Sequence, residues 1–369
     1  MTIRCARIHA YRLALAAPIS TARARLTHRD GYLVELMDGS GKTGWGDACP
    51  IEGFGLENWE QCGAALAMGC SAWVSATASA SIPEEIHAPA ARGALEVAAI
   101  DLEARLKGKR FSDELVRDEG QAAVPTLPVS GFLVGQTQRE LESCAEQLMG
   151  RGHRSLKLKV AERNWSEDRD RVRWVTGMLP PGFKLRLDAN GGWSESEAAR
   201  VFDDLAASPI ELIEQPVMAD NLAAMARLRQ VAPWPIAADE AIVRPGDLQR
   251  VIDQGAADVV ILKPSALGGP RAAWALANRA MEAGLGVVVT SLMDSALGVA
   301  AAIQVAALLP TDRLADGLAT GGLFVRDLAP SSPIIEGRIN VPDGKGLGLR
   351  PEASALAALS HEPLREFRP

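Results

Sequence analysis

Residues 155–160 read SLKLKV, and four more short apolar segments follow: FKLRLDAN (183–190), IELIEQP (210–216), PIAADEA (235–241) and DVVILKP (258–264). The stretches between them, such as 165–177 and 194–206, have apolar residues at helical spacing. Short strands that alternate with amphipathic helices predict a parallel sheet covered by helices. The repeat is steady, because Lys157, Asp188, Glu214, Asp239 and Lys263 follow one another at intervals of 31, 26, 25 and 24 residues. This regularity favours a closed barrel over an open sheet.

The chain on either side of the repeat has a different character. Residues 1–120 begin with strand and turn signals, such as GYLVELMD (31–38) followed by GSGK, and continue with alanine-rich helical stretches. They predict a small α+β domain that precedes the barrel of residues 121–324. The last segment, residues 325–369, is rich in Pro and Gly, and we expect it to return to the N-terminal domain.

Composition excludes several classes of partner. The formal net charge is −7 and no basic patch is interleaved with aromatic residues, which argues against nucleic acid. No window reaches the roughly 18 to 20 apolar residues of a membrane span. The five cysteines are odd in number and none are spaced as C-x-x-C, so a disulfide framework is not expected and a reducing cytoplasm fits best. A small molecule is therefore the expected partner, and a homo-oligomer is compatible with the sequence.

Three of the segments end in a carboxylate: Asp188, Glu214 and Asp239. In a parallel barrel the C-terminal ends of all strands meet at one mouth, where active sites lie. A single Asp or Glu at a strand end is as easily explained as a helix cap as it is as a metal ligand. Three carboxylates on consecutive strands would, however, repel one another. A divalent cation relieves that repulsion, and Mg²⁺ suits a site that keeps positions open for substrate. The sequence therefore predicts a Mg²⁺ site, with Mn²⁺ as a substitute. Glu240 follows Asp239 directly and is expected to face the other way.

Lysines are predicted on either side of this metal site. Strand alternation puts Lys157 and Lys159 on one face, and Lys263 ends the strand after the third carboxylate. A lone K-x-K pattern is more typical of a solvated edge strand, but buried lysines in a barrel are costly unless function needs them. We expect removal of a proton α to a carboxylate, with Lys159 as base and Lys157 as the cation that favours its neutral form.

Taken together, the motifs K-x-K, D-A-N, E-Q-P, D-E and L-K-P resemble the enolase superfamily, in its muconate-lactonising subgroup, over nearly the whole chain. The resemblance implies an α/β fold: a modified TIM barrel, (β/α)7β, with an N-terminal α+β capping domain. It implies Mg²⁺ held by Asp188, Glu214 and Asp239, with lysines flanking the substrate. The strand GVVVTSLMDS (286–295) has no His, unlike the mandelate-racemase subgroup.

Within the subgroup, three stretches are most similar to the o-succinylbenzoate synthase family: GWGDACPIEGFG (44–55), LRLDANGGW (185–193) and TSLMDSALGVAAAIQVAALLP (290–310) with GLATGGLF after it. This implies a carbon–oxygen lyase that dehydrates a cyclohexadiene carboxylate in menaquinone synthesis. Lys159 would remove the proton and then protonate the departing hydroxide, and Lys263 would stabilise the enolate from the opposite face.

The same resemblance suggests parts of the site that contact substrate. The glycine-rich stretch 44–55 is expected to form a loop that closes over the substrate, with Trp45 and Phe54 as core aromatics. Asp294 stands where those synthases usually have Glu. The implied candidates for substrate contacts are Arg186, Asn190, Ser291 and Asp294.

Other activities on the same frame stay open. Relatives racemise N-succinylamino acids, epimerise dipeptides or lactonise muconate, and an isomerase would use Lys159 and Lys263 as opposed acid and base. A dipeptide epimerase would need acidic residues near the last barrel strands, where this chain offers only Asp294. A catalytically silent binding barrel is the most remote alternative, because all six polar residues of the predicted centre are present.

Overall fold

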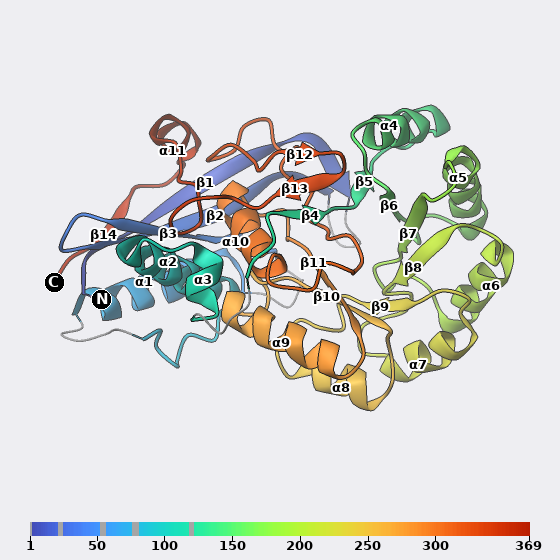
Figure 1. Ribbon diagram of the computed structural model, residues 1–369, viewed down its shortest axis with the longest axis horizontal. Helices are drawn as coiled ribbons and strands as arrows, with labels where there is room; N and C mark the ends of the chain where they lie inside the picture. The colour runs from blue at the N-terminus through green and yellow to red at the C-terminus, as the bar shows by residue number, and fades with distance from the viewer. Residues whose placement is uncertain (1, 21–24, 52–56, 76–80, 118–121) are drawn as a thin grey trace.

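The computed structural model describes residues 2–20, 25–51, 57–75, 81–117 and 122–369. Figure 1 shows an antiparallel sheet with helices near both chain termini on the left, and on the right a parallel sheet surrounded by helices. The two parts are described in turn, because the site lies where they meet.

The N-terminal part is a four-stranded antiparallel sheet with two long helices on it. The strands are ordered β14–β1–β2–β3. They are β1 (Ile3–Ser20), β2 (Arg25–Asp38), β3 (Thr43–Ala48) and, from the other end of the chain, β14 (Arg365–Phe367). The helices are α1 (Trp59–Ser75) and α2 (Pro89–Lys107), with the short α3 (Phe111–Leu115) after them. The predicted turn between β2 and β3 is present, with Gly41 at φ 80°.

The glycine-rich stretch 44–55 is only partly a loop. Residues 44–48 belong to β3, where Gly44 and Gly46 lie against the backbone of α2 and a Cβ at either position would collide with it. The prediction of a substrate loop is therefore wrong for these residues, since their glycines serve close packing of helix on strand. Residues 52–56, which include Phe54, lie outside the described residues.

From residue 131 onward, parallel strands and helices alternate without a break. The order is β5 (Gly131–Leu133), α4 (Gln138–Gly150), β6 (Ser155–Lys159), α5 (Trp165–Met178), β7 (Lys184–Asp188), α6 (Glu195–Leu205), β8 (Ile210–Glu214), α7 (Leu222–Val231), β9 (Ile236–Ala238), α8 (Asp247–Asp253), β10 (Val259–Leu262), α9 (Pro270–Glu282), β11 (Gly286–Val289) and α10 (Ala296–Ala306). The seven strands pair in sequence order. Asp316 pairs with Val129 just before β5, and Gly317 pairs with Thr290 just after β11, which closes the ring. The predicted (β/α)7β barrel is confirmed.

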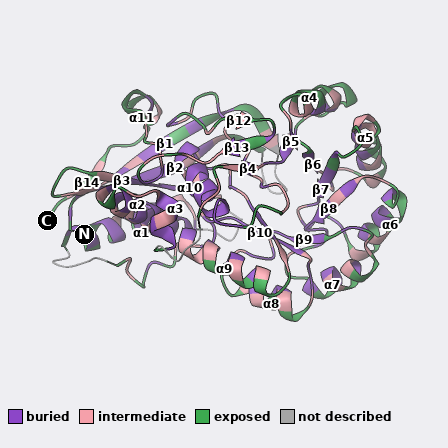
Figure 2. Ribbon diagram, viewed as in Figure 1, coloured by how far each residue is buried: buried purple, intermediate pink, exposed green. Residues whose placement is uncertain are grey.

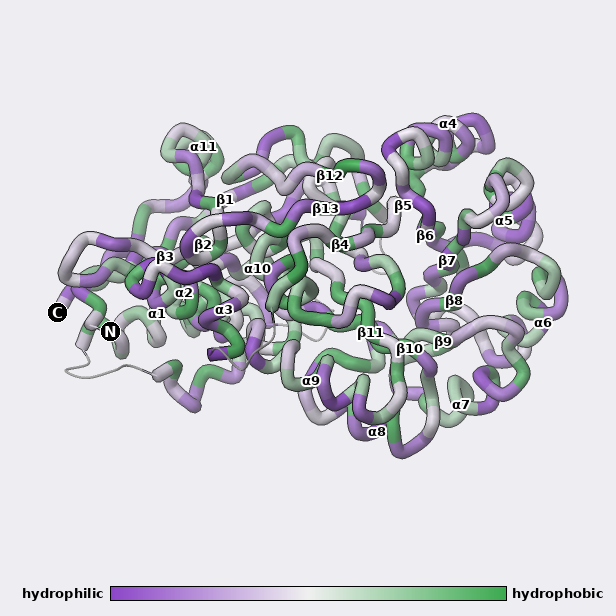
Figure 3. Tube along the Cα trace, viewed as in Figure 1, coloured by the Kyte–Doolittle hydropathy of each residue, from purple (hydrophilic) through white to green (hydrophobic). Residues whose placement is uncertain are grey.

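The helices predicted at 165–177 and 194–206 correspond to α5 and α6. Ser194 caps α6: its side chain accepts a hydrogen bond from the backbone N–H of Glu197, and Glu197 accepts one in return. Asn164 accepts the equivalent bond at the start of α5. Figure 3 shows hydrophilic and hydrophobic residues mixed along α4 to α7, as amphipathic helices require.

Each barrel strand buries one face against the helices and the other inside the barrel. Leu156 and Leu158 on β6, like Leu185 and Leu187 on β7, lie in the large apolar cluster that includes the helices. A second, smaller cluster lies on the strand face that leads to Glu214 and Lys263, below those residues. We call it the barrel floor, and it consists of Leu212, Ala237, Val259, Ile261 and Val288. Figure 2 shows the strands as almost entirely buried, so the barrel is a packed core rather than a pore.

The last segment of the chain contacts both parts of the molecule. Strands β12 (Ile334–Ile335) and β13 (Arg338–Asn340) form a small sheet with β4 (Thr126–Pro128), which precedes the barrel. After α11 (Ala353–Leu359), strand β14 pairs with β1 of the N-terminal sheet. Across the described ranges, every helix is too short or too polar to cross a bilayer.

Candidate active site

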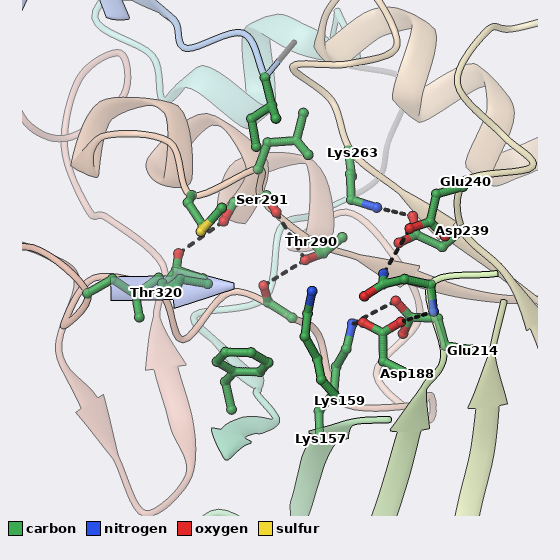
Figure 4. A pocket seen from close by; sticks show the side chains of 18 of the residues that line it. Lys157, Lys159, Asp188, Glu214, Asp239, Glu240, Lys263, Thr290, Ser291 and Thr320 are labelled. Carbon is green, nitrogen blue, oxygen red and sulfur yellow. Dashed lines mark hydrogen bonds and ion pairs between the residues drawn. The ribbon is translucent and has the colours of Figure 1, made fainter. Parts of the chain in front are cut away.

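A cavity of about 710 Å³ lies at the mouth of the barrel, beneath the N-terminal domain. All six residues predicted for the metal centre and its flanking lysines line this one cavity: Lys157, Lys159, Asp188, Glu214, Asp239 and Lys263. Asn190 and Ser291, two of the predicted substrate contacts, line it as well. Figure 4 shows the lysines and carboxylates converging from neighbouring strand ends.

Strand alternation explains how these side chains meet. Asp188 and Glu214 are the last residues of β7 and β8, and they pair directly across the two strands. Lys159 pairs with Asp188 in the same way across β6 and β7. Asp239 and Lys263 each follow the last residue of a strand, β9 and β10. The three carboxylates are 2–4% exposed, so their charges depend on partners inside the protein.

Lys157 is held between two of these carboxylates. Its Nζ lies 2.7 Å from Asp188 Oδ2 and 2.6 Å from Glu214 Oε1. Burial works against its charge, but the two carboxylates prevail and raise the pKa of Lys157 above its usual value. Burial likewise tends to raise the pKa of Asp188, yet Lys157 and Lys159 lower it on balance. Lys157 is therefore an ammonium that orients two carboxylates.

Lys263 occupies the opposite side of the cavity and contacts Asp239 through its Nζ. Burial lowers the pKa of Lys263 to about 7, and the positive charge of Lys157 acts in the same direction. A lysine in such a position can gain or lose a proton near neutral pH.

Lys159 differs from both of these lysines. It points into the cavity in Figure 4, and no hydrogen bond or ion pair of its ammonium is found among the described residues. An amino group that faces a cavity without a fixed partner can approach a bound substrate, which is the geometry that a general base needs.

One residue of the site contradicts the expectation from sequence. Glu240 was expected to face away from Asp239, but it lines the same cavity. Strand β9 ends at Ala238, so the alternation of side chains no longer applies at residues 239 and 240. Asn190 Nδ2 donates to Glu240 Oε1 at 2.8 Å, and burial, together with the charges of Asp188 and Glu214, raises the pKa of Glu240 to about 7.

Gln215 is a second residue that sequence reasoning missed. It is fully buried, and its Oε1 accepts hydrogen bonds from the backbone N–H groups of Asp239 at 3.0 Å and Ala241 at 3.1 Å. Its φ is 41°, a left-handed value that costs energy in a residue other than glycine. The Gln of the E-Q-P motif thus fixes the turn that presents Asp239 and Glu240.

Two of the predicted substrate contacts are not brought to the cavity. Arg186 lies deeper in the barrel, where its Nε pairs with Glu211 at 2.5 Å and its Nη1 donates to Ala315 O at 2.7 Å. Asp294 is buried beside the cavity, and its Oδ2 accepts from the backbone N–H of Leu292 at 3.1 Å. Neither residue lines the cavity. Arg186 is on the inward face of its strand and Asp294 is near the last strand, but neither position is enough to bring the side chain into the cavity.

The N-terminal domain supplies the roof of the cavity. Its contribution is mainly apolar, from Ile19, Leu26, Pro50 and Ile51, and it includes one cation, Arg29. The Arg29 guanidinium donates to the carbonyl oxygens of Cys49, of Pro50 at 3.2 Å and of Met293 at 3.4 Å. These bonds join the N-terminal domain to the loop after β11. No sequence pattern marks Arg29, since its role depends on how the two parts pack.

The donor set at the mouth suits a hard divalent cation. Within the described residues, no three Asp, Glu, His or Cys side chains are close enough together to form a ready-made metal site, because lysines separate the carboxylates. The lining nevertheless brings four carboxylates into one cavity, beside three lysines and Arg29, and Glu240 Oε2 is buried with no hydrogen-bond partner among the described residues. Carboxylate oxygens are the ligands that Mg²⁺ prefers, so these residues fit the predicted group.

Comparison with known proteins identifies the family. Residues 140–355, more than half of the chain, match the family described as enolase C-terminal domain-like, and residues 3–102 match the MenC N-terminal domain. The chain therefore belongs to the enolase superfamily, as its motifs predicted.

Its relatives include o-succinylbenzoate synthases. That of Thermobifida fusca is 35% identical over 319 residues, which cover 85% of this chain and 82% of the relative. That of Mycobacterium ulcerans is 41% identical over 217 residues, but the match spans only 58% of this chain and 62% of the relative. Among solved structures, the dipeptide epimerase from Cytophaga hutchinsonii, complexed with Mg and the dipeptide D-Ala-L-Val, superposes with a TM-score of 0.89 at 24% identity and full coverage of both chains. That likeness shows the shared fold.

Proposed function

We propose that this chain is an o-succinylbenzoate synthase, a carbon–oxygen lyase that eliminates water from a hydroxylated cyclohexadiene carboxylate in the menaquinone pathway. The observation that carries the proposal is the placement of Lys159 and Lys263 on opposite sides of three buried carboxylates in one cavity. The identity of 35% with the Thermobifida fusca synthase over most of both chains supports the choice of substrate. We propose the cytoplasm as its location.

Asp188, Glu214 and Asp239 would hold Mg²⁺, or Mn²⁺ in its place. When bound, the cation stabilises the negative charge that develops on the substrate carboxylate as the α-proton leaves. Lys157 keeps Asp188 and Glu214 oriented through its two ion pairs.

Lys159 acts first as base and then as acid. Its neutral amine takes the α-proton, and the electrons of that C–H bond pass toward the substrate carboxylate to give the enolate. These electrons then form the new C=C double bond as the C–O bond to the β-hydroxyl breaks. The proton on Lys159 then passes to the departing hydroxide, which leaves as water. One lysine on one face of the ring serves both transfers, which requires a syn elimination. Lys263, from the opposite face, contributes positive charge next to the developing enolate.

The remaining lining holds the rest of the substrate. Phe132, Val243, Leu292 and Leu323 give the cavity apolar walls that suit a six-membered carbon ring. Asn190 and Ser291 are the polar side chains that we propose for substrate contact. Ser291 is already hydrogen-bonded to Thr320, which also lines the cavity, with 3.0 Å between the hydroxyl oxygens.

The proposal also divides the chain by role. Residues 1–120 would cap the site, residues 121–324 would form the catalytic barrel, and residues 325–369 would tie the two together. The pairing of β13 with β4 and of β14 with β1 supports this division.

The activity is tested with the hydroxylated cyclohexadiene carboxylate, by following the loss of its diene absorbance in the presence of Mg²⁺. The alternative is a racemase of N-succinylamino acids, since two lysines on opposite faces of a carbon also suit a 1,1-proton transfer. In D₂O a racemase would incorporate deuterium into recovered N-succinylamino acid. A purified chain that does so, and leaves the cyclohexadiene unchanged, would overturn the lyase assignment.

A further inference from the structure

A buried ion pair on α5 contacts the backbone at the end of β6, the strand that carries Lys159. Asp168 and Arg171 lie on the first two turns of α5, with Arg171 Nη1 2.7 Å from Asp168 Oδ1. Asp168 is fully buried and Arg171 is 7% exposed. The mechanism proposed above uses neither residue, and a buried pair of charges is not by itself a source of stability.

Both side chains of this pair form hydrogen bonds to the backbone at the end of β6, one at Lys159 and the other at Ala161. Arg171 Nη1 donates to the carbonyl oxygen of Lys159 at 3.1 Å, and the backbone N–H of Ala161 donates to Asp168 Oδ2 at 2.6 Å. Ala161 has a φ of 67°, an unfavourable left-handed value that such bonds can hold in place. Between them, the N–H of Val160 bonds to the carbonyl oxygen of Asp188 at 2.9 Å.

The surroundings leave this backbone little freedom. A Cβ on Gly192, in the loop after β7, would lie 2.7 Å from the Cβ of Ala161. The chain at residues 159–161 is therefore fixed from α5 on one side and from the β7 loop on the other.

The three lysines of the cavity are held in different ways. Lys157 and Lys263 are fixed through their ammonium groups, by ion pairs to carboxylates. Lys159 has no such partner among the described residues, so its reach is set by its backbone. We propose that Asp168 and Arg171 are positioning residues for the catalytic base. Their bonds to the strand end set where the Lys159 amine meets the α-proton. This inference rests on the proposed function, because it takes Lys159 as the base.

The test compares two buried Arg–Asp pairs of the same kind. In the N-terminal domain, Arg105 pairs with Asp101 at 2.9 Å and donates to the carbonyl oxygen of Leu349 at 2.9 Å, while Asp101 accepts a backbone N–H from Trp45. Arg171→Met and Arg105→Met therefore remove matched interactions, and only the first is at the strand end of Lys159. The readouts are kcat and KM for the cyclohexadiene carboxylate, the thermal midpoint, and the isotope effect with α-deuterated substrate.

We expect both variants to lose thermal stability. Arg171→Met should also lower kcat about 10- to 100-fold, because a small misplacement of a reacting group is costly. Its KM should stay within about threefold of the wild-type value, and its isotope effect should rise as proton transfer becomes slower. Arg105→Met should keep kcat and the isotope effect of the wild type at temperatures where it is folded.

Equal kcat values for the two folded variants, or a loss confined to KM, would overturn the positioning role. If Arg171→Met does not fold, Arg171→Lys is measured in the same way. It keeps the charge beside Asp168 and should show a smaller fall in kcat, with a smaller rise in the isotope effect. The variant Lys159→Ala distinguishes a failure of the positioning role from a failure of the proposed function. Turnover by Lys159→Ala refutes the proposed function, whereas its inactivity together with a normal Arg171→Met refutes the positioning role alone.

Discussion

The mouth and the floor of the barrel are built from the same strands. Their side chains are only two residues apart along each strand, yet they differ completely in chemistry. On β8, Glu214 is two residues after Leu212 of the floor. Likewise Lys263, the residue directly after β10, is two residues after Ile261. Side chains at this spacing share a face of the strand. The floor places apolar side chains inside the barrel, and the mouth places charges there.

The two layers contribute differently to stability and to activity. Each Leu, Ile or Val side chain of the floor stabilises the fold through burial, by roughly 1.5–3 kcal/mol. The mouth carries buried carboxylates and lysines whose desolvation is offset in part by their mutual pairing. A fold selected for stability alone would continue the apolar pattern upward, so the charges at the mouth indicate function. The following predictions test that separation.

Lys159→Ala should give the largest effect. With the base removed, kcat should fall about 10²- to 10⁴-fold. The free energy of unfolding should change by less than about 0.5 kcal/mol, because the described part of the chain holds no hydrogen-bond or ion-pair partner for this ammonium. Lys184→Ala, at the exposed beginning of β7, is the matched control and should retain full activity. The comparison fails if Lys159→Ala turns over at a wild-type rate, or if it loses activity only by unfolding.

Ile261→Ala should show the opposite behaviour. Ile261 is 2% exposed in the floor, and its truncation leaves a cavity that should lower the free energy of unfolding by about 2–5 kcal/mol. Its kcat, measured well below the new melting temperature, should remain within about threefold of the wild type. Ile261→Val should cost only about 0.5–1.5 kcal/mol. A large fall in kcat without loss of stability would mean that the floor, too, takes part in catalysis.

Removal of the metal should affect the mouth alone. Treatment with EDTA should abolish turnover, and Mg²⁺ or Mn²⁺ should restore it. Mg²⁺ at 100 times its Kd should stabilise the protein by about 2.7 kcal/mol. Glu214→Gln should lose this stabilisation, because an amide is a weaker ligand, whereas Ile261→Val should keep it. Turnover that is indifferent to EDTA would refute the metal site.

These contrasts show which parts of the molecule the sequence could predict. Alternation within strands and the regular repeat predicted the barrel and the convergence of Lys157, Lys159 and Asp188, because both rules are local. Glu240 was placed wrongly because β9 ends one residue before Asp239, and strand ends are poorly marked in sequence. Arg29 could not be found, since it joins segments more than 260 residues apart. The partner of Arg186 depends on interior packing, which no spacing rule describes.

The smallest expected effect is a pH dependence confined to the mouth. Burial raises the pKa of Glu240 from its usual 4.5 to about 7 in the folded protein, and the charges of Asp188 and Glu214 act in the same direction. The folded state therefore holds this proton more tightly than the unfolded chain, so the associated stability is complete below about pH 4.5 and is lost as the pH rises through 7.

Glu240→Gln imitates the protonated form and can keep the hydrogen bond from Asn190. In EDTA, the unfolding free energy of this variant minus that of the wild type should grow by about 1–2 kcal/mol between pH 5 and pH 7.5. Chemical denaturation across that range measures it. Ile261→Val should follow the wild-type pH profile at a constant offset, since the floor has no proton to lose. If the difference in unfolding free energy between Glu240→Gln and the wild type does not change with pH, the Glu240 carboxyl is ionised in the folded protein throughout this range. The charges of the mouth are then balanced by other means.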